Sequence, residues 1–116
     1  MKKKKEVISE NILEKIPVRS SYIEWKTDEE KIVTLEIKNT GWANKIAQLF
    51  FNRPKVSYVH LDKFGSFVWS IIDDESDIIK LGKLVEEEFG EEANPLYERL
   101  AKYFKILESY HFVQLL

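Results

Sequence analysis

The hydrophobic repeat of this chain changes its period within one short stretch, residues 56–69. The first six residues form the run of a strand, with Val56, Tyr58 and His60 on one face and Ser57, Val59 and Leu61 on the other. Beyond Asp62 the apolar residues recur at the spacing of an amphipathic helix. The carboxylate of Asp62 can accept a hydrogen bond from the first free N–H groups of a helix. The stretch therefore predicts a strand at residues 56–61 that leads directly into a capped helix. The apolar stripe of this helix is Phe64, Phe67, Val68, Ile71 and Ile72.

Two more strands are expected before this junction. Residues 22–26 and 32–38 alternate in the same way, and the polar residues 27–30 between them suit a turn. The face of the second strand that we expect to be buried consists of Val33, Leu35 and Ile37. The two segments together predict a hairpin with one buried face.

Two more helices and a closing strand are expected after the junction. Ser76 is the predicted cap of a helix that stops at Gly90. Asn94 is the predicted cap of the last helix, with Pro95 at its first helical position. Residues 112–116 are expected to form a short strand. The apolar stripes are Ile78, Leu81, Val85 and Phe89 in the earlier helix and Leu96, Leu100, Tyr103, Phe104 and Leu107 in the later one.

The remaining segments are interpreted as additions to this order. Residues 1–17 are expected to be a lead-in segment, with a short helical turn capped by Ser9 and stopped by Pro17. Residues 42–51 carry apolar side chains at helical spacing and predict a short inserted helix, which Arg53-Pro54 ends. The predicted fold over residues 18–116 is α+β and winged-helix-like, with a three-stranded antiparallel sheet packed on a three-helix bundle.

Few residues of the chain suggest catalysis. The 116 residues include no cysteine, which excludes disulfides and thiolate chemistry, and the only histidines are His60 and His111. Neither histidine has the spacing of a metal ligand or of a serine-activating base. The acidic residues 73–77 lack the glycine of a calcium loop, and Gly65-Ser66 lacks the rest of a phosphate loop. We therefore expect a protein without catalytic, metal or cofactor-binding residues.

Charge and hydropathy limit the partners. The net charge of −2 creates no long-range field for nucleic acid or an anionic membrane. No apolar run reaches the length of a membrane span, and residues 1–17 lack the apolar core of a signal peptide, so a cytoplasmic location is expected. The residues around Trp42 and Lys45 form a candidate basic and aromatic membrane-surface element, but an apolar cover for the core is the favoured interpretation.

A DNA-binding regulator is the alternative that the fold class leaves open. Three helices beside a small sheet describe a winged helix-turn-helix, in which one helix enters the major groove. The charges argue against this function, because the helix before Gly90 carries three successive glutamates, residues 86–88. The basic residues of the last helix, Arg99, Lys102 and Lys105, are interleaved with Glu98 and Glu108.

An open sheet border is the feature that best suits binding. A small three-stranded sheet leaves at least one border uncovered unless helices cover it. The N–H and C=O groups along such a border can accept an extended peptide as an added strand. Residues 56–61 are the candidate strand, which makes the chain a binding module in this interpretation.

The second half of the chain also resembles a known family. The sequence HLDKFGSFVWSIIDDESDIIKLGKLVEEEFG, followed by ERLAKYFKILESYHFV, is similar to the PqqD-like family, small proteins related to the peptide chaperone of pyrroloquinoline quinone (PQQ) synthesis. The similarity lies in Leu61-Asp62 before the first helix, the apolar residues 67–69, the acidic turn, the Ser76 cap and the leucine-rich last helix. It covers residues 54–113 well and residues 18–38 loosely.

The resemblance implies a winged-helix-like peptide-recognition domain, a RiPP recognition element. Such a domain captures the leader of a ribosomally made precursor peptide and presents the precursor to a radical S-adenosylmethionine (SAM) enzyme. The leader pairs with the third strand and rests on the third helix, with basic residues such as Lys55 at the rim. By position, the implied peptide-binding residues are Val56, Ser57, Tyr58, Val59, His60, Tyr97, Leu100, Ala101, Phe104 and Lys105.

The chain departs from the family pattern in three places. Residues 39–52 lengthen the link between the second and third strands, Asp73-Asp74 stands where many relatives have aspartate-glycine, and the segment up to Pro17 has no counterpart. The expected partners are a precursor peptide and a radical SAM enzyme, with no nucleic acid and no membrane. The expected state is a monomer or a swapped dimer, because exposed strand borders favour exchange.

Overall fold

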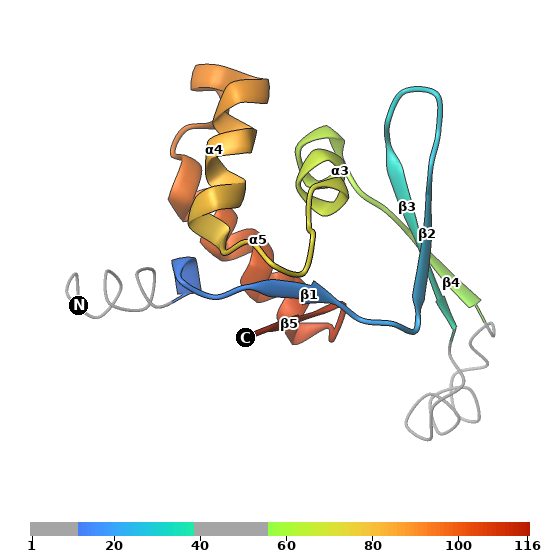
Figure 1. The fold of residues 1–116 in the computed structure, drawn as a ribbon. Coiled ribbons are helices and arrows are strands. Elements are labelled where there is room, and N and C mark those ends of the chain that lie inside the picture. Colours follow the sequence, from blue (N-terminus) through green and yellow to red (C-terminus); the bar gives the residue numbers. More distant parts are fainter. Residues whose placement is uncertain (1–11, 39–55) are drawn as a thin grey trace. The chain divides into compact units, whose positions relative to one another are not determined.

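The computed structural model describes residues 12–38 and 56–116, which form an α+β fold (Figure 1). These residues divide into two compact units, 12–20 with 67–116 and 21–38 with 56–66, so the division falls inside a helix. The predicted boundary at residue 17 stays a prediction. The elements are β1 (Pro17–Arg19), β2 (Ile23–Thr27), β3 (Val33–Lys38), β4 (Val56–His60), α3 (Lys63–Ser70), α4 (Ile78–Phe89), the 3-10 helix η1 (Gly90–Ala93), α5 (Leu96–Ser109) and β5 (Val113–Leu115).

The unit Ser21–Ser66 contains the three-stranded antiparallel sheet, with the strand order β2-β3-β4. The predicted hairpin is confirmed, because β2 pairs with β3 in the register Trp25↔Leu35. Its turn is held by Asp28, whose Oδ1 accepts the N–H groups of Glu30 at 2.8 Å and Ile32 at 3.0 Å. Val33 and Leu35 are completely buried. The predicted buried face of β3 is therefore real at two of its three positions, while Ile37 is half-buried.

The junction between strand and helix is built as the change of period predicts. β4 ends at His60, and Gly65 donates its N–H to Oδ1 of Asp62 at 2.6 Å, which caps the first turn of α3. The helix is shorter than the apolar stripe, since it ends at Ser70. Ile71 and Ile72 follow it in a turn.

The cap of α4 differs from the prediction. Asp77 is the N-cap, and its Oδ1 accepts the N–H of Lys80 at 2.9 Å. Ser76 instead donates its hydroxyl to Oδ2 of Asp73 at 2.9 Å, because Asp73 organises the preceding acidic turn. In that turn Asp74 has φ 63°, the left-handed conformation that glycine adopts most readily.

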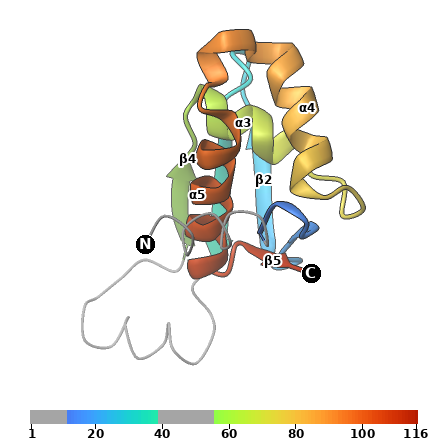
Figure 2. The ribbon, with the colours of Figure 1, turned by 90° about the vertical axis from the view of Figure 1, so that its left-hand side faces the viewer.

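The start of α5 also differs from the prediction. Gly90 ends α4 with φ 60°, as expected, but η1 follows it directly. Asn94 closes η1 by donating its N–H to the Glu91 carbonyl at 3.1 Å, and Pro95 is the N-cap of α5 rather than its first helical residue. Figure 2 shows η1 joining α4 and α5 at one end. The buried residues of α5 are Leu96, Leu100, Ala101, Phe104 and Leu107.

A second, two-stranded sheet joins the two ends of the described chain. β1 pairs antiparallel with β5, with Val18 opposite Gln114 (Figure 1). The expected closing strand is confirmed, whereas β1 lies where only the end of the lead-in segment and the beginning of the domain were expected. Ile16 and Leu116 extend the pairing by exchanging backbone hydrogen bonds of 2.9 and 3.0 Å. The helical turn of Ile12 and Leu13 therefore ends four residues before Pro17, which begins a strand.

Some predictions lie outside the described residues. These are the cap at Ser9, the inserted helix at residues 42–51 with its end at Arg53-Pro54, and the rim residue Lys55. In the part of the chain that the structure describes, no helix combines the length and the apolar character needed to cross a bilayer.

Candidate functional site

The third strand of the sheet occupies a border position. β4 pairs with β3 in the register Leu35↔Val59 and Ile37↔Ser57. Among the described residues no strand lies on the other side of β4. The predicted border strand is thus at the edge of this sheet, and the five residues expected to bind peptide on it, Val56, Ser57, Tyr58, Val59 and His60, make up the whole strand.

The direction of the backbone groups of β4 follows from one hydrogen bond. Leu61 donates its N–H to the carbonyl of Val33 at 2.9 Å, so this pair is of the hydrogen-bonded type. Hydrogen-bonded and non-hydrogen-bonded pairs alternate along an antiparallel ladder. Val59 and Ser57 therefore direct their N–H and C=O groups toward β3. The same groups of Val56, Tyr58 and His60 point away from the sheet.

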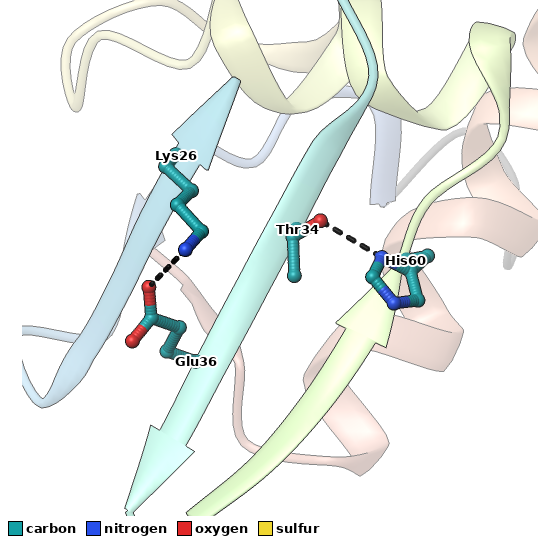
Figure 3. Close-up of polar contacts among 4 residues, drawn as sticks. All are labelled: Lys26, Thr34, Glu36 and His60. Carbon is teal, nitrogen blue, oxygen red and sulfur yellow. Dashed lines mark hydrogen bonds and ion pairs between the residues drawn. The ribbon is translucent and has the colours of Figure 1, made fainter. Parts of the chain in front are cut away.

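Two exposed side chains mark this border. The side chain of Tyr58 is 59% exposed, and His60 is also exposed. Nδ1 of His60 lies 2.8 Å from the hydroxyl oxygen of Thr34 on β3 (Figure 3). The contact holds the imidazole ring on the solvent face of the sheet, beside the outward backbone groups.

The solvent face of the sheet carries equal numbers of acidic and basic groups near the strands. Lys26 on β2 forms an ion pair with Glu36 on β3, with 3.7 Å between Nζ and Oε2 (Figure 3). Lys38 on β3 pairs with Glu24 on β2 at 3.0 Å. Exposed pairs of this kind contribute little stability. These two pairs balance acidic and basic charge on this face of the described sheet.

The residues implied on the last helix all lie on α5, in the other compact unit. Lys105 is exposed and Tyr97 half-buried, whereas Leu100 and Phe104 are 0% exposed and Ala101 is 7% exposed. The three buried side chains belong to the core of their unit. The role of these five residues in peptide binding stays a prediction from the resemblance.

Arg19 has a structural role that the sequence does not signal. Its Nη2 donates to the carbonyl oxygens of Trp69 at 2.8 Å and Ile72 at 2.7 Å, at the C-terminal end of α3. Burial lowers the pKa of Arg19 below its ordinary value, and the negative charge of Asp74 opposes this change. An isolated arginine in a short polar segment has no periodicity that would have identified this contact.

Residues 12–38 and 56–116 contain no candidate metal site, because no three histidine or carboxylate side chains among them are grouped closely enough to hold an ion.

Comparisons with protein-family models, with curated proteins and with solved structures find no match for this chain. Membership of the PqqD-like family, the absence of catalysis and the cytoplasmic location therefore stay predictions.

Proposed function

We propose that this protein is a PqqD-like, non-catalytic accessory protein that binds the leader of a ribosomally made precursor peptide by strand addition. It would then present the precursor to a radical SAM enzyme. The observation that supports this proposal is the border position of β4, where the backbone groups of Val56, Tyr58 and His60 point away from β3. An extended peptide can pair with a row of this kind.

The backbone would supply most of the affinity. Each of the three outward residues offers one donor and one acceptor, and a hydrogen bond contributes about 0.5–1.5 kcal/mol net. Side chains of the guest would alternate between the two faces of the sheet. On the solvent face they would lie next to Tyr58 and His60. These contacts would set the register of the guest peptide on β4 without requiring one particular peptide sequence.

Proline at position 58 tests the proposal. The N–H of Tyr58 points away from β3, so Tyr58→Pro removes a guest-pairing donor and leaves the β3–β4 ladder intact, as proline on a sheet border generally does. Tyr58→Ala is the matched control, because it removes the ring and keeps the N–H. We expect Tyr58→Pro to abolish peptide binding and Tyr58→Ala to weaken it less.

Amide chemical shifts measure the binding. Synthetic leader peptides, taken from short precursor genes next to this gene, are titrated into isotopically labelled protein. The amides of Val56, Tyr58 and His60 should shift first. Unchanged affinity of a folded Tyr58→Pro variant, or shifts confined to α4, would refute strand addition at β4.

Salt dependence separates this function from DNA binding. Nucleic-acid binding weakens steeply as salt is added, because phosphates release counterions, whereas backbone pairing is much less sensitive. Peptide affinity that changes little with salt supports the proposal. Tight, salt-sensitive binding of duplex DNA supports the regulator instead.

A further inference from the structure

The opposite border of the same sheet has a self-complementary sequence. β2 reads Ile-Glu-Trp-Lys-Thr, and it is the other outer strand of the order β2-β3-β4. Glu24 and Lys26 stand at equal distances on either side of Trp25, and both side chains are exposed. A strand of this kind carries opposite charges at positions that a two-fold axis through Trp25 exchanges.

The backbone of β2 has a defined direction. Asp28 donates its N–H to the carbonyl of Ile32 at 3.1 Å, so this pair at the end of the hairpin is hydrogen-bonded. Alternation along the ladder then directs the groups of Lys26 and Glu24 toward β3. The N–H and C=O groups of Ile23 and Thr27 point outward.

The antiparallel register that pairs all five residues of β2 with β2 of a second copy suits both the backbone and the charges. With the two-fold axis at Trp25, Ile23 lies opposite Thr27 of the second copy, so outward groups meet outward groups. Glu24 then lies opposite Lys26 of the second copy, and the reverse pair forms by symmetry. A shift of the axis to position 24 or 26 places like charges opposite each other, which is destabilising.

The charges of the sheet continue across this junction. Lys38 already contacts Glu24, and Lys26 contacts Glu36. When two copies pair, Glu24 of each copy contacts Lys26 of the other, and these contacts lie between the ion pairs of the two sheets. Acidic and basic side chains then alternate from one sheet to the other. A lysine on a border strand normally discourages pairing with another strand. Here the glutamate two residues earlier offsets it in one register.

We propose that β2 forms an isologous dimer interface with β2 of a second copy of this chain, with the two-fold axis at Trp25. The pairing joins two three-stranded sheets into one continuous sheet and leaves β4 of each copy at an outer border. This interface is separate from the peptide-binding border and does not depend on the proposed function.

Charge reversal at two positions tests the register. Glu24→Lys and Lys26→Glu each place like charges opposite each other twice per dimer, and we expect either variant to weaken dimerisation about tenfold or more. The double variant, Glu24→Lys with Lys26→Glu, restores opposite charges and should dimerise like the original chain. An equimolar mixture of the two single variants should form a heterodimer more tightly than either variant alone forms a homodimer.

Sedimentation equilibrium over a concentration series at low salt measures these states, and circular dichroism checks that each variant is folded. Glu29→Lys, in the turn after β2, changes the net charge by the same amount as Glu24→Lys and should leave the dimer unaffected. Tyr58→Pro should also leave it unaffected, since β4 is not part of the interface. A chain that stays monomeric up to about 1 mM, a dimer that both single variants retain, or a mixture that fails to associate would overturn the proposal.

Discussion

The guanidinium of Arg19 lies over the indole ring of Trp69, 5.6 Å from the ring centroid, and its Nη2 bonds the carbonyl oxygen of the same residue at 2.8 Å. A second bond of 2.7 Å reaches the carbonyl of Ile72. The C-terminal carbonyls of a helix carry partial negative charge and have no partners within the helix. The guanidinium of Arg19 therefore links β1 to the C-terminal end of α3 through hydrogen bonds and ring stacking.

Replacement of Arg19 by methionine should destabilise the fold. Methionine keeps much of the apolar length but donates no hydrogen bond, so the part-buried carbonyls of Trp69 and Ile72 lose a charged donor. We expect the free energy of unfolding to fall by about 2–3 kcal/mol. Urea denaturation followed by tryptophan fluorescence measures the change.

Lysine at position 19 is the matched comparison. It keeps the charge but offers a point-like ammonium in place of the planar fork that reaches several carbonyls and stacks on the ring of Trp69. Arg19→Lys should therefore recover only part of the lost stability. Equal stabilities of Arg19→Lys and the original chain would show that charge alone is sufficient.

Ser66 is the buried polar residue of the strand–helix junction, and its loss should also be measurable. Its side chain is 1% exposed, its Oγ accepts the N–H of Val33 at 2.8 Å, and the hydroxyl donates to the Leu61 carbonyl at 3.3 Å. Ser66→Ala leaves the Val33 N–H without this acceptor, which should reduce the free energy of unfolding by about 1–3 kcal/mol. Hydrogen exchange at the Val33 amide should also be faster in the Ser66→Ala variant.

Ser70→Ala is the control for this prediction. The Ser70 hydroxyl is exposed and bonds the Phe67 carbonyl within the same helix at 2.7 Å. Water can replace that bond, so the substitution should change stability by less than about 0.5 kcal/mol. Equal effects of the two alanine variants would contradict the role assigned to Ser66.

The periodic parts of the sequence predict most of the observed elements. Residues 56–61 were expected as a strand and form β4 at Val56–His60, and the carboxylate of Asp62 caps the next helix as expected. An open border was also expected, because a small three-stranded sheet leaves at least one border uncovered unless helices cover it, and residues 56–61 were the candidate strand for that border. Alternation and capping are local, so a single sequence can reveal them.

The differences come from contacts between residues that are distant in sequence or from competition between adjacent polar groups. β1 has three residues, too few to show an alternating pattern, and it depends on pairing with β5 at the other end of the chain. Ser76 and Asp77 are both good caps, and Asp73 decides between them by engaging Ser76. No spacing rule reveals such a choice.

Gly82 provides a packing prediction between α4 and α5. A Cβ at this position would lie 2.6 Å from Cε1 of Tyr97 and 3.1 Å from Cδ1 of Leu100. Alanine favours a helix by about 1 kcal/mol over glycine, but the overlap forces the tyrosine ring to move. We expect Gly82→Ala to be destabilising by about 1–2 kcal/mol in thermal or urea denaturation.

A double variant identifies the source of that effect. In a Tyr97→Ala background the nearest overlap is absent, so Gly82→Ala should destabilise less than it does in the original chain. The coupling free energy, which is the non-additive part of the two changes in unfolding free energy, measures the contact between α4 and α5 at Gly82 and Tyr97. Additive effects would mean that Tyr97 is not the obstacle.

Asp73 predicts a dependence of stability on pH. The N–H and hydroxyl of Ser76 and the N–H of Glu75 bond its carboxylate, which lowers the pKa of Asp73 below 3.8. The folded protein therefore binds this proton more weakly than the unfolded chain, so the contribution is complete above pH 3.8 and disappears as the pH falls through the lowered pKa. Asp73→Asn should lower the melting temperature at pH 7, and the difference from the original chain should vanish in acid. Glu75→Gln controls for the loss of one negative charge in the same turn, and a difference for Asp73→Asn that is constant from pH 7 into acid would contradict this assignment.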